Sequence, residues 1–219
     1  MAKFRVLDKQ GRLRRDSDGI WGRGPSPHYG VRYNLVPPIK RHFSSQSTGT
    51  LTQSPYGLLA SAPPQASLAN LRIWDKAITG GPWRITAALC PLLYPETAVH
   101  HCGILLRETS SARLHSISIW DDGTLTVSRW TSPTLFSSND VAATSFPGII
   151  EIPRFLSLKA DSVGNYFFEL SDGFGNYQNL YSIAVGSWLT ADRIGFYVNA
   201  GSLNVTAVVT LLSWQRTAE

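Results

Sequence analysis

From residue 56 onward, apolar and polar residues alternate in short runs separated by turn-forming clusters. Alternation with period two is typical of strands with one buried face, and short runs rich in β-branched and aromatic residues indicate a sandwich or barrel. Helical periodicity is nearly absent. The pattern predicts strands over residues 56-60, 68-74, 83-89, 101-108, 113-120, 124-131, 149-160, 164-171, 177-185, 193-199 and 204-215. This set of strands favours two packed antiparallel sheets.

The clearest local signal is a hairpin around Gly123. A three-residue loop with this glycine in the left-handed region would place four apolar side chains on one face. The pairs would then be Ile119 with Leu125 and Ile117 with Val127. A two-residue turn would shift the pairing by one residue and mix apolar with polar side chains on each face. The sequence therefore predicts the three-residue loop.

The opposite face of this hairpin presents two indoles among small hydroxylated residues. Its members are Trp120, Ser118, Ser116, Thr126, Ser128 and Trp130. Such a surface suits sugar rings, whose C–H faces stack on aromatic rings and whose hydroxyls form hydrogen bonds. The alternative is that a second layer, a loop or a neighbouring subunit covers the two tryptophans, because large aromatics often complete packing. The face is thus either a glycan platform or a covered surface.

The basic charge of the chain is concentrated at its start. The first forty-one residues hold ten Lys/Arg against three Asp, a net charge of +7, whereas the rest holds ten Lys/Arg against twelve Asp/Glu. Clustered charges, glycines and prolines indicate extended backbone that buries little apolar surface. We expect an anchoring arm over residues 1-41, a linker or first strand over 42-55 and a sandwich over 56-219. The candidate partner contacts of the arm are Arg12, Arg14, Arg15 and Trp21, unless these residues only solvate the tail.

Size and composition suit one domain plus an arm, and no run approaches the length of a membrane span. The opening residues lack the apolar stretch of a secretory signal, so we expect synthesis and folding in a cytosol. In that compartment Cys90 and Cys102 are expected to be packed thiols rather than a disulfide. The body is nearly neutral and has no basic face, so we expect neither a specific nucleic-acid partner nor a membrane partner.

The sequence displays no motif for catalysis or metal binding. Cleavage of a glycosidic bond usually requires two carboxylates about 5 to 10 Å apart, and Glu108, Glu151 and Glu169 are solitary members of separate predicted strands. His100 and His101 are adjacent on a strand and point to opposite faces, so they cannot easily share one ion. We therefore expect no catalytic residue, no metal, no cofactor and no enzymatic activity.

The segment from Gly57 to Trp214 resembles the concanavalin A-like lectin/glucanase jelly rolls, particularly those of bacteriophage virion proteins. The resemblance lies in residues 83–89, 102–108, 119–127, 166–173, 193–199 and 212–214, and it covers about three quarters of the chain. It implies an all-β fold, an antiparallel two-sheet jelly-roll sandwich whose concave sheet often receives glycans. The carboxylates of the family's glucanases and the Asp/Asn-rich metal loop of its plant lectins are missing, so neither activity is carried over.

This resemblance implies a non-enzymatic virion structural protein, made in the host cytoplasm, that serves as a decoration, fibre or tail-attachment module. The arm would bind other virion proteins, and a homo-oligomer is expected because sandwich edges need protection. The alternative is a carbohydrate-binding module for host surface glycans, and a glycoside hydrolase or lyase rests on fold analogy alone. The candidate glycan contacts are Trp120, Trp130, Tyr197 and Asn199. The last two share strand parity and should point away from the core.

Overall fold

The structure is a computed structural model that describes residues 6–7, 13–14, 35–64, 69–78, 80–92, 100–120, 122–144, 154–199, 201 and 206–219. These residues are almost entirely in strands, and their one helical element is the 3₁₀ turn η1 (Lys40–His42). The strands are β1 (Val6–Leu7), β2 (Leu13–Arg14), β3 (Ser44–Ser45), β4 (Thr50–Ser54), β5 (Gly57–Ala62), β6 (Leu71–Ala77), β7 (Trp83–Leu92), β8 (His101–Arg107), β9 (Leu114–Trp120), β10 (Leu125–Ser132), β11 (Leu135–Thr144), β12 (Arg154–Ala160), β13 (Asn165–Ser171), β14 (Tyr177–Ala184), β15 (Arg193–Asn199) and β16 (Ala207–Ala218).

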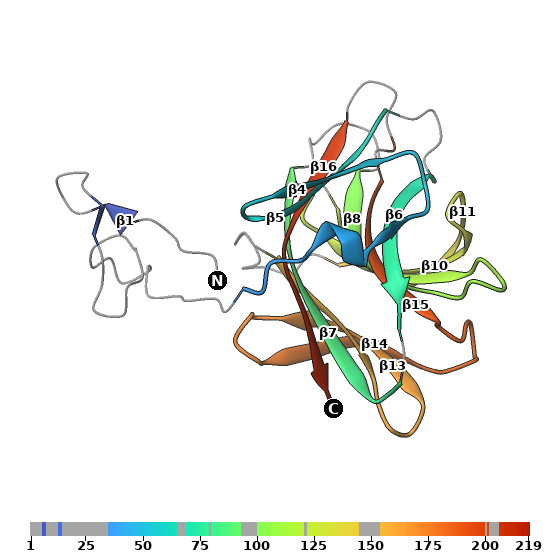
Figure 1. Cartoon of the computed structure of the whole chain (residues 1–219). Helices are drawn as coiled ribbons and strands as arrows, with labels where there is room; N and C mark the ends of the chain where they lie inside the picture. Colours follow the sequence, from blue (N-terminus) through green and yellow to red (C-terminus); the bar gives the residue numbers. More distant parts are fainter. Residues whose placement is uncertain are drawn as a thin grey trace.

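Two seven-stranded antiparallel sheets pack face to face in a jelly-roll sandwich, which confirms the predicted fold class. The first sheet has the order β11-β10-β9-β8-β15-β6-β3, and the second has the order β14-β13-β12-β7-β16-β5-β4. In Figure 1 the strands β6, β10 and β11 of the first sheet lie on the right, and β4, β5 and β16 of the second lie on the left. Strands that follow one another in the chain often belong to different sheets, so both outward faces combine residues from distant parts of the sequence.

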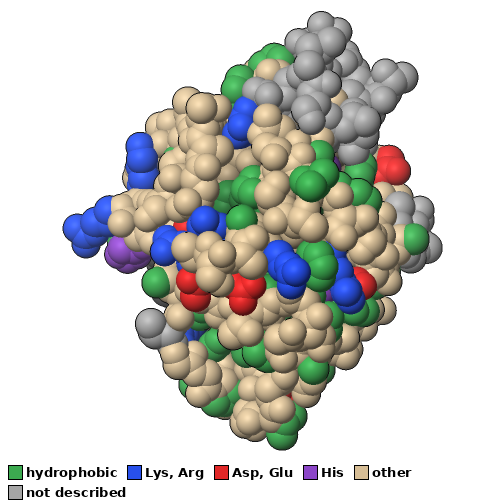
Figure 2. Space-filling model, turned by 90° about the vertical axis from the view of Figure 1, so that its right-hand side faces the viewer, with side chains coloured by type: hydrophobic (Ala, Val, Ile, Leu, Met, Phe, Trp, Pro, Cys, Tyr) green, Lys and Arg blue, Asp and Glu red, His purple; other side chains and the backbone are tan. Residues whose placement is uncertain are grey.

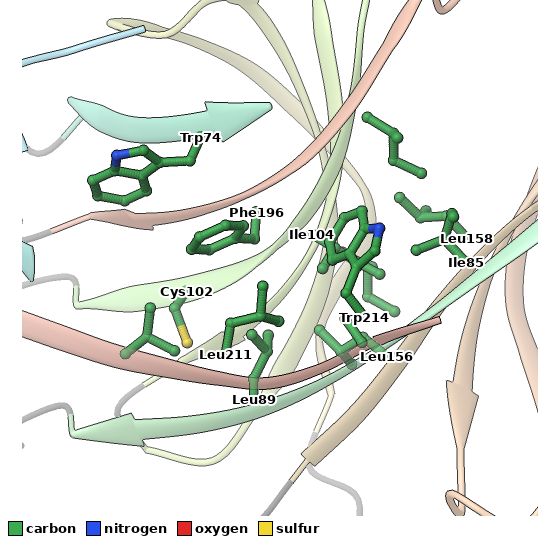
Figure 3. Packing of buried hydrophobic residues seen from close by; sticks show 14 of the residues in the cluster. Trp74, Ile85, Leu89, Cys102, Ile104, Leu156, Leu158, Phe196, Leu211 and Trp214 are labelled. Atoms are coloured by element: carbon green, nitrogen blue, oxygen red, sulfur yellow. The ribbon is translucent and has the colours of Figure 1, made fainter. Parts of the chain in front are cut away.

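The inward side chains of the two sheets form one large core (Figure 3). At one end of it, the Phe43 ring packs edge-on against both Phe196 and Trp214, with a centroid distance of 5.3 Å in each case. Trp74 stacks on Phe196 at 5.5 Å. Each buried aromatic side chain contributes about 2–3 kcal/mol of transfer free energy. Burial of this face decides which residues of every strand point outward, where a ligand can be bound.

The hairpin of β9 and β10 has the predicted register. Leu125 lies opposite Ile119, and Val127 lies opposite Ile117. Gly123 has a φ of +80°, which only glycine adopts at low steric cost. The loop is closed by a hydrogen bond from the Trp120 amide to the Thr124 carbonyl. All four apolar side chains lie in the main core, so the three-residue loop is confirmed.

The described end of the arm contacts the sandwich. Leu35 is only 5% exposed and belongs to a buried cluster with Ala88 and Phe155. Val36 accepts a hydrogen bond from the Trp214 amide through its carbonyl. Arg12, Arg15 and Trp21 lie outside the described residues, and of Arg14 only the backbone is described, where it pairs with Val6. The predicted partner contacts of these four residues therefore remain predictions.

Two further properties bear on function. Both cysteines are free thiols, and burial raises the pKa of Cys102. Among the described residues, no helix has the length and apolar character required to cross a membrane. The same part of the chain contains no group of three or more His, Cys, Asp or Glu side chains that could hold a metal ion.

Candidate functional site

The four predicted glycan contacts all lie on the outward face of the first sheet, but they differ in exposure. Trp130 is 4% exposed, and Tyr197 and Asn199 are completely buried. Trp120 is partly exposed. We call the surface formed by these four residues, His101, Ser116 and Ser118 the closed face. A ligand can reach only Trp120 in this conformation, so the other three cannot contact a sugar without rearrangement.

A chain of hydrogen bonds runs through the closed face. The backbone N–H of Asn70 donates to Asn199 Oδ1 at 3.1 Å, which fixes the orientation of the Asn199 side-chain amide. Asn199 Nδ2 is then the donor to His101 Nε2 at 3.2 Å. The proton of the neutral imidazole therefore lies on Nδ1, where it is donated to the Tyr197 hydroxyl at 3.1 Å. The Tyr197 hydroxyl and Ser118 Oγ share a further hydrogen bond at 2.6 Å.

His101 is the centre of this face. Its ring stacks between the two indoles, with centroid distances of 4.7 Å to Trp120 and 5.9 Å to Trp130. Burial, with a smaller contribution from His100, lowers the pKa of His101 to about 3. The imidazole is therefore neutral near pH 7, in agreement with its acceptance of a hydrogen bond from Asn199. Since its polar groups bond one another, the closed face is a packed layer.

Farther along the same outward face, charged side chains are paired. Asp75 is completely buried and accepts hydrogen bonds from Arg107 at 2.8 Å and from Arg193 at 2.7 Å. Figure 2 shows this side of the molecule, where Lys and Arg side chains lie beside Asp and Glu side chains. The two arginines connect Asp75 on β6 to its neighbour β15 and to β8 on the far side of β15, and they occupy the one carboxylate of this cluster.

The outward face of the second sheet contains an open hollow of about 350 Å³. It is lined by Thr86, Phe155, Ser171, Gly173, Phe174, Gly175, Tyr177, Ser213 and Gln215. None of these nine residues carries a charge. The Phe174 side chain is 55% exposed, and Tyr177 is half-buried. The hollow therefore combines accessible aromatic rings with hydroxyl and amide groups, which is the combination that the sequence suggested for the closed face.

The loop between β13 and β14 holds Phe174 at the rim of the hollow. Asp172 Oδ1 accepts hydrogen bonds from the backbone N–H of Phe174 at 2.7 Å and from the backbone N–H of Asn176 at 3.2 Å. The Asn176 side chain donates to the other carboxylate oxygen. These donors lower the pKa of the Asp172 carboxyl, and the hydrogen bond from the Asn176 side chain has the largest effect. The loop is thus closed by its own hydrogen bonds, and it presents an apolar ring to solvent before any ligand is bound.

Next to the hollow, Arg84 connects two carboxylates. It binds Glu169 with an Nε–Oε2 distance of 3.1 Å and Glu219 with an Nη1–Oε1 distance of 2.5 Å. Its guanidinium lies 3.8 Å from the centroid of the Tyr177 ring, whose hydroxyl is 3.2 Å from Thr86 Oγ1. Glu169 was interpreted from the sequence as a solitary carboxylate. The second carboxylate, Glu219, lies 50 residues away and directly follows β16, so no local motif could have indicated the pair.

The chain is a two-sheet jelly-roll sandwich with an uncharged hollow on one outward face. No protein-family model matches the chain, and no curated protein matches it in sequence. Solved structures do match. The carbohydrate-binding module CBM66 from Bacillus subtilis has a TM-score of 0.54 and 8% identity, with 86% of this chain and 99% of that chain covered. The shared concanavalin A-like fold confirms the fold expected from the resemblance.

Two enzymes have the same fold. An engineered GH43 glycoside hydrolase matches with a TM-score of 0.58 and 17% identity, over 97% of this chain and 48% of that chain. The Crh5 transglycosylase matches with a TM-score of 0.55 and 10% identity, with 84% of this chain and 81% of that chain covered. These matches correct our expectation that the chain is not an enzyme, because the fold is used by enzymes as well. The lack of a carboxylate pair within any one predicted strand is also no argument against activity, since the tertiary structure brings Glu169 and Glu219 to Arg84.

Proposed function

We propose that this protein binds carbohydrate, and that the hollow on the second sheet takes a short, neutral saccharide. The observation that carries the proposal is the pre-positioned, exposed Phe174 ring beside a half-buried Tyr177 in a hollow of about 350 Å³. This volume lies at the lower end of the range for ligand pockets, which is about 300–1,000 Å³. Sugar rings stack their C–H faces on such aromatic side chains.

The polar groups of the hollow favour a neutral ligand. Hydroxyls of Thr86 and Ser171 and the amide of Gln215 can exchange hydrogen bonds with sugar hydroxyls. The nearby cation, Arg84, is already bound by two carboxylates. An acidic sugar would therefore have to compete with these ion pairs, whereas a neutral sugar needs no counter-charge. The fold that the chain shares with the carbohydrate-binding module CBM66 supports this proposal.

The test begins with a glycan array and continues with calorimetric titration of cellotetraose, xylotetraose and maltotetraose. We expect Phe174→Ala and Gln215→Ala to weaken binding at least tenfold. The matched control is Tyr56→Ala, which removes an aromatic side chain that is 68% exposed on the β4–β5 turn. Binding that is unchanged in Phe174→Ala but lost in Trp120→Ala would transfer the saccharide site to the closed face. No binding by the wild type on the array would refute carbohydrate binding.

The same saccharides also test a hydrolytic function, which the carboxylate pair beside the hollow favours as a second candidate. Release of reducing ends by the wild type, abolished in Glu169→Gln, would make the protein a glycoside hydrolase. Arg84 binds both carboxylates, and Ser157 donates a further hydrogen bond to Glu169 at 3.1 Å. Because these contacts already occupy both carboxylates, and hydrolysis needs one of them to act on the glycosidic bond, binding is the function that the geometry supports better.

We further propose that the basic arm anchors the protein on an acidic protein surface of a bacteriophage virion. The charge of +7 within residues 1–41 supports this proposal, because clustered Lys and Arg favour an acidic partner. Since residues 35 and 36 contact the sandwich, the informative deletion removes residues 1–34. We expect particles assembled with this variant to lose the protein during purification. Full retention would exclude the arm as the anchor.

A further inference from the structure

Two residues that line the hollow are held by the segment that joins the arm to the sandwich. Phe155 points outward from β12, away from the main core, yet it is largely buried in a cluster with Leu35 and Ala88. Ser213 Oγ accepts a hydrogen bond from the Val36 amide at 2.9 Å. Leu35 and Val36, which we call the arm root, therefore contact the β12 wall and the β16 wall of the hollow.

The arm root is fixed by the edge of β16. This strand pairs with β5 as far as Leu211, and an irregularity in its pairing with β7 follows between Leu211 and Ser213. Beyond this point the Trp214 amide donates to the Val36 carbonyl at 3.0 Å. Val36 thus takes a backbone position beside β16 where the pairing with β5 has ended. The arm root is attached through main-chain hydrogen bonds, which do not depend on its side chains.

The chain is tied again a few residues later. The Gln53 side chain on β4 accepts a hydrogen bond from the Lys40 amide at 2.8 Å and donates one to the Pro38 carbonyl at 3.2 Å. Between the two attachment points, Ile39 is 44% exposed. The segment therefore has one apolar residue, Leu35, that is buried in a cluster with Phe155, and another, Ile39, that faces solvent. This pair provides a matched comparison within a single stretch of chain.

We propose that Leu35 is a positioning residue for the saccharide site, and that attachment of the arm is coupled to saccharide affinity. This inference rests on the proposed function of the hollow. Leu35 shares a buried cluster with Phe155, an outward aromatic ring that lines the hollow, so its packing helps to hold that ring in place. A partner that holds the arm root in place would strengthen saccharide binding. By linkage, a bound saccharide would strengthen attachment of the arm by the same factor.

The experiment uses the full chain and three variants, Leu35→Ala, Leu35→Met and Ile39→Ala. The first removes the packing on Phe155, the second restores side-chain volume, and the third is the exposed control. Binding of cellotetraose, xylotetraose and maltotetraose is measured by calorimetry. Hydrogen–deuterium exchange of residues 154–160 and 211–216 reports on the two walls without any ligand. Thermal unfolding is recorded for each variant so that affinities are compared only at temperatures where the chain is folded.

We expect Leu35→Ala to weaken tetrasaccharide binding about tenfold and to accelerate exchange in both walls. Leu35→Met should return affinity to within about twofold of the wild type, and Ile39→Ala should change neither readout. Unchanged exchange in Leu35→Ala, or an equal effect of Ile39→Ala, would overturn the inference. If the wild type binds no saccharide, the proposed function fails by that result alone. The exchange comparison would then still decide whether the arm root shapes the hollow.

Discussion

The outward faces of the two sheets are built from the same kinds of residue and have opposite accessibility. On the first sheet, Trp130 and Tyr197 lie among serines and are buried, and their polar atoms bond one another or a neighbouring hydroxyl. On the second sheet, Phe174 and Tyr177 lie among hydroxyl and amide side chains and border an open hollow. The comparison shows that an aromatic and hydroxylated surface does not by itself identify a binding site. The decisive property is which groups already occupy its hydrogen-bonding positions.

The largest expected difference between the faces is in stability. Trp130→Ala should lower the free energy of unfolding by about 3–5 kcal/mol, because it leaves a cavity in a packed layer and frees the Ser116 hydroxyl that its indole binds. Urea unfolding followed by circular dichroism measures this change. A loss below about 1 kcal/mol would mean that the closed face is not packed in solution, and it would return Trp130 to the candidate glycan contacts.

The second prediction concerns pH. Because the pKa of His101 is about 3 in the folded state and about 6.5 when unfolded, the unfolded chain binds more protons between these values. Stability should therefore fall by about 2 kcal/mol between pH 7.5 and pH 5 through this group. His115 also has a pKa lowered mainly by burial and acts in the same direction. The free energy of unfolding is measured against pH for the wild type and for His101→Gln. The difference between the two slopes gives the contribution of His101. An identical slope in that variant would contradict the neutral, buried imidazole.

A smaller effect is expected from removal of one hydroxyl of the closed face. Tyr197→Phe leaves His101 Nδ1 and Ser118 Oγ without their shared partner. The expected loss is about 1–3 kcal/mol, since unsatisfied buried polar groups retain their desolvation cost. The control Tyr56→Phe removes an exposed hydroxyl and should change stability by less than about 0.5 kcal/mol. Equal urea midpoints for the two variants would show that the chain through Tyr197 is open to water.

The smallest stability effect is expected at the hollow. Phe174→Ala should change the free energy of unfolding by less than about 0.5 kcal/mol, because the ring is mostly exposed and its loop is closed by Asp172. The same variant is expected to lose at least tenfold in tetrasaccharide affinity. This combination separates a binding residue from a structural one. A stability loss above 1 kcal/mol would show that Phe174 packs like the aromatics of the closed face.

Local patterns predicted most strands, because inward side chains alternate with outward ones wherever a sheet buries one face. The edge strand β11 was missed, since its Ser, Asn and Asp residues lack the apolar alternation that a core face imposes. It forms because β10 offers a pairing edge, and Asp140 binds both Arg129 and His115 from there. Edge strands that depend on such partners are difficult to predict from sequence.

The sequence by itself determined the class of fold, the hairpin register at Gly123 and the parity that sends Tyr197 and Asn199 outward. These features depend on neighbours within a few residues, so a local pattern contains them. Only the tertiary structure decided that the closed face is filled, that Glu169 and Glu219 meet at Arg84, and that Leu35 packs in one cluster with Phe155. Each of these depends on atoms from distant strands. Exposure and electrostatic pairing are properties of the assembled sheets, and no single strand specifies them.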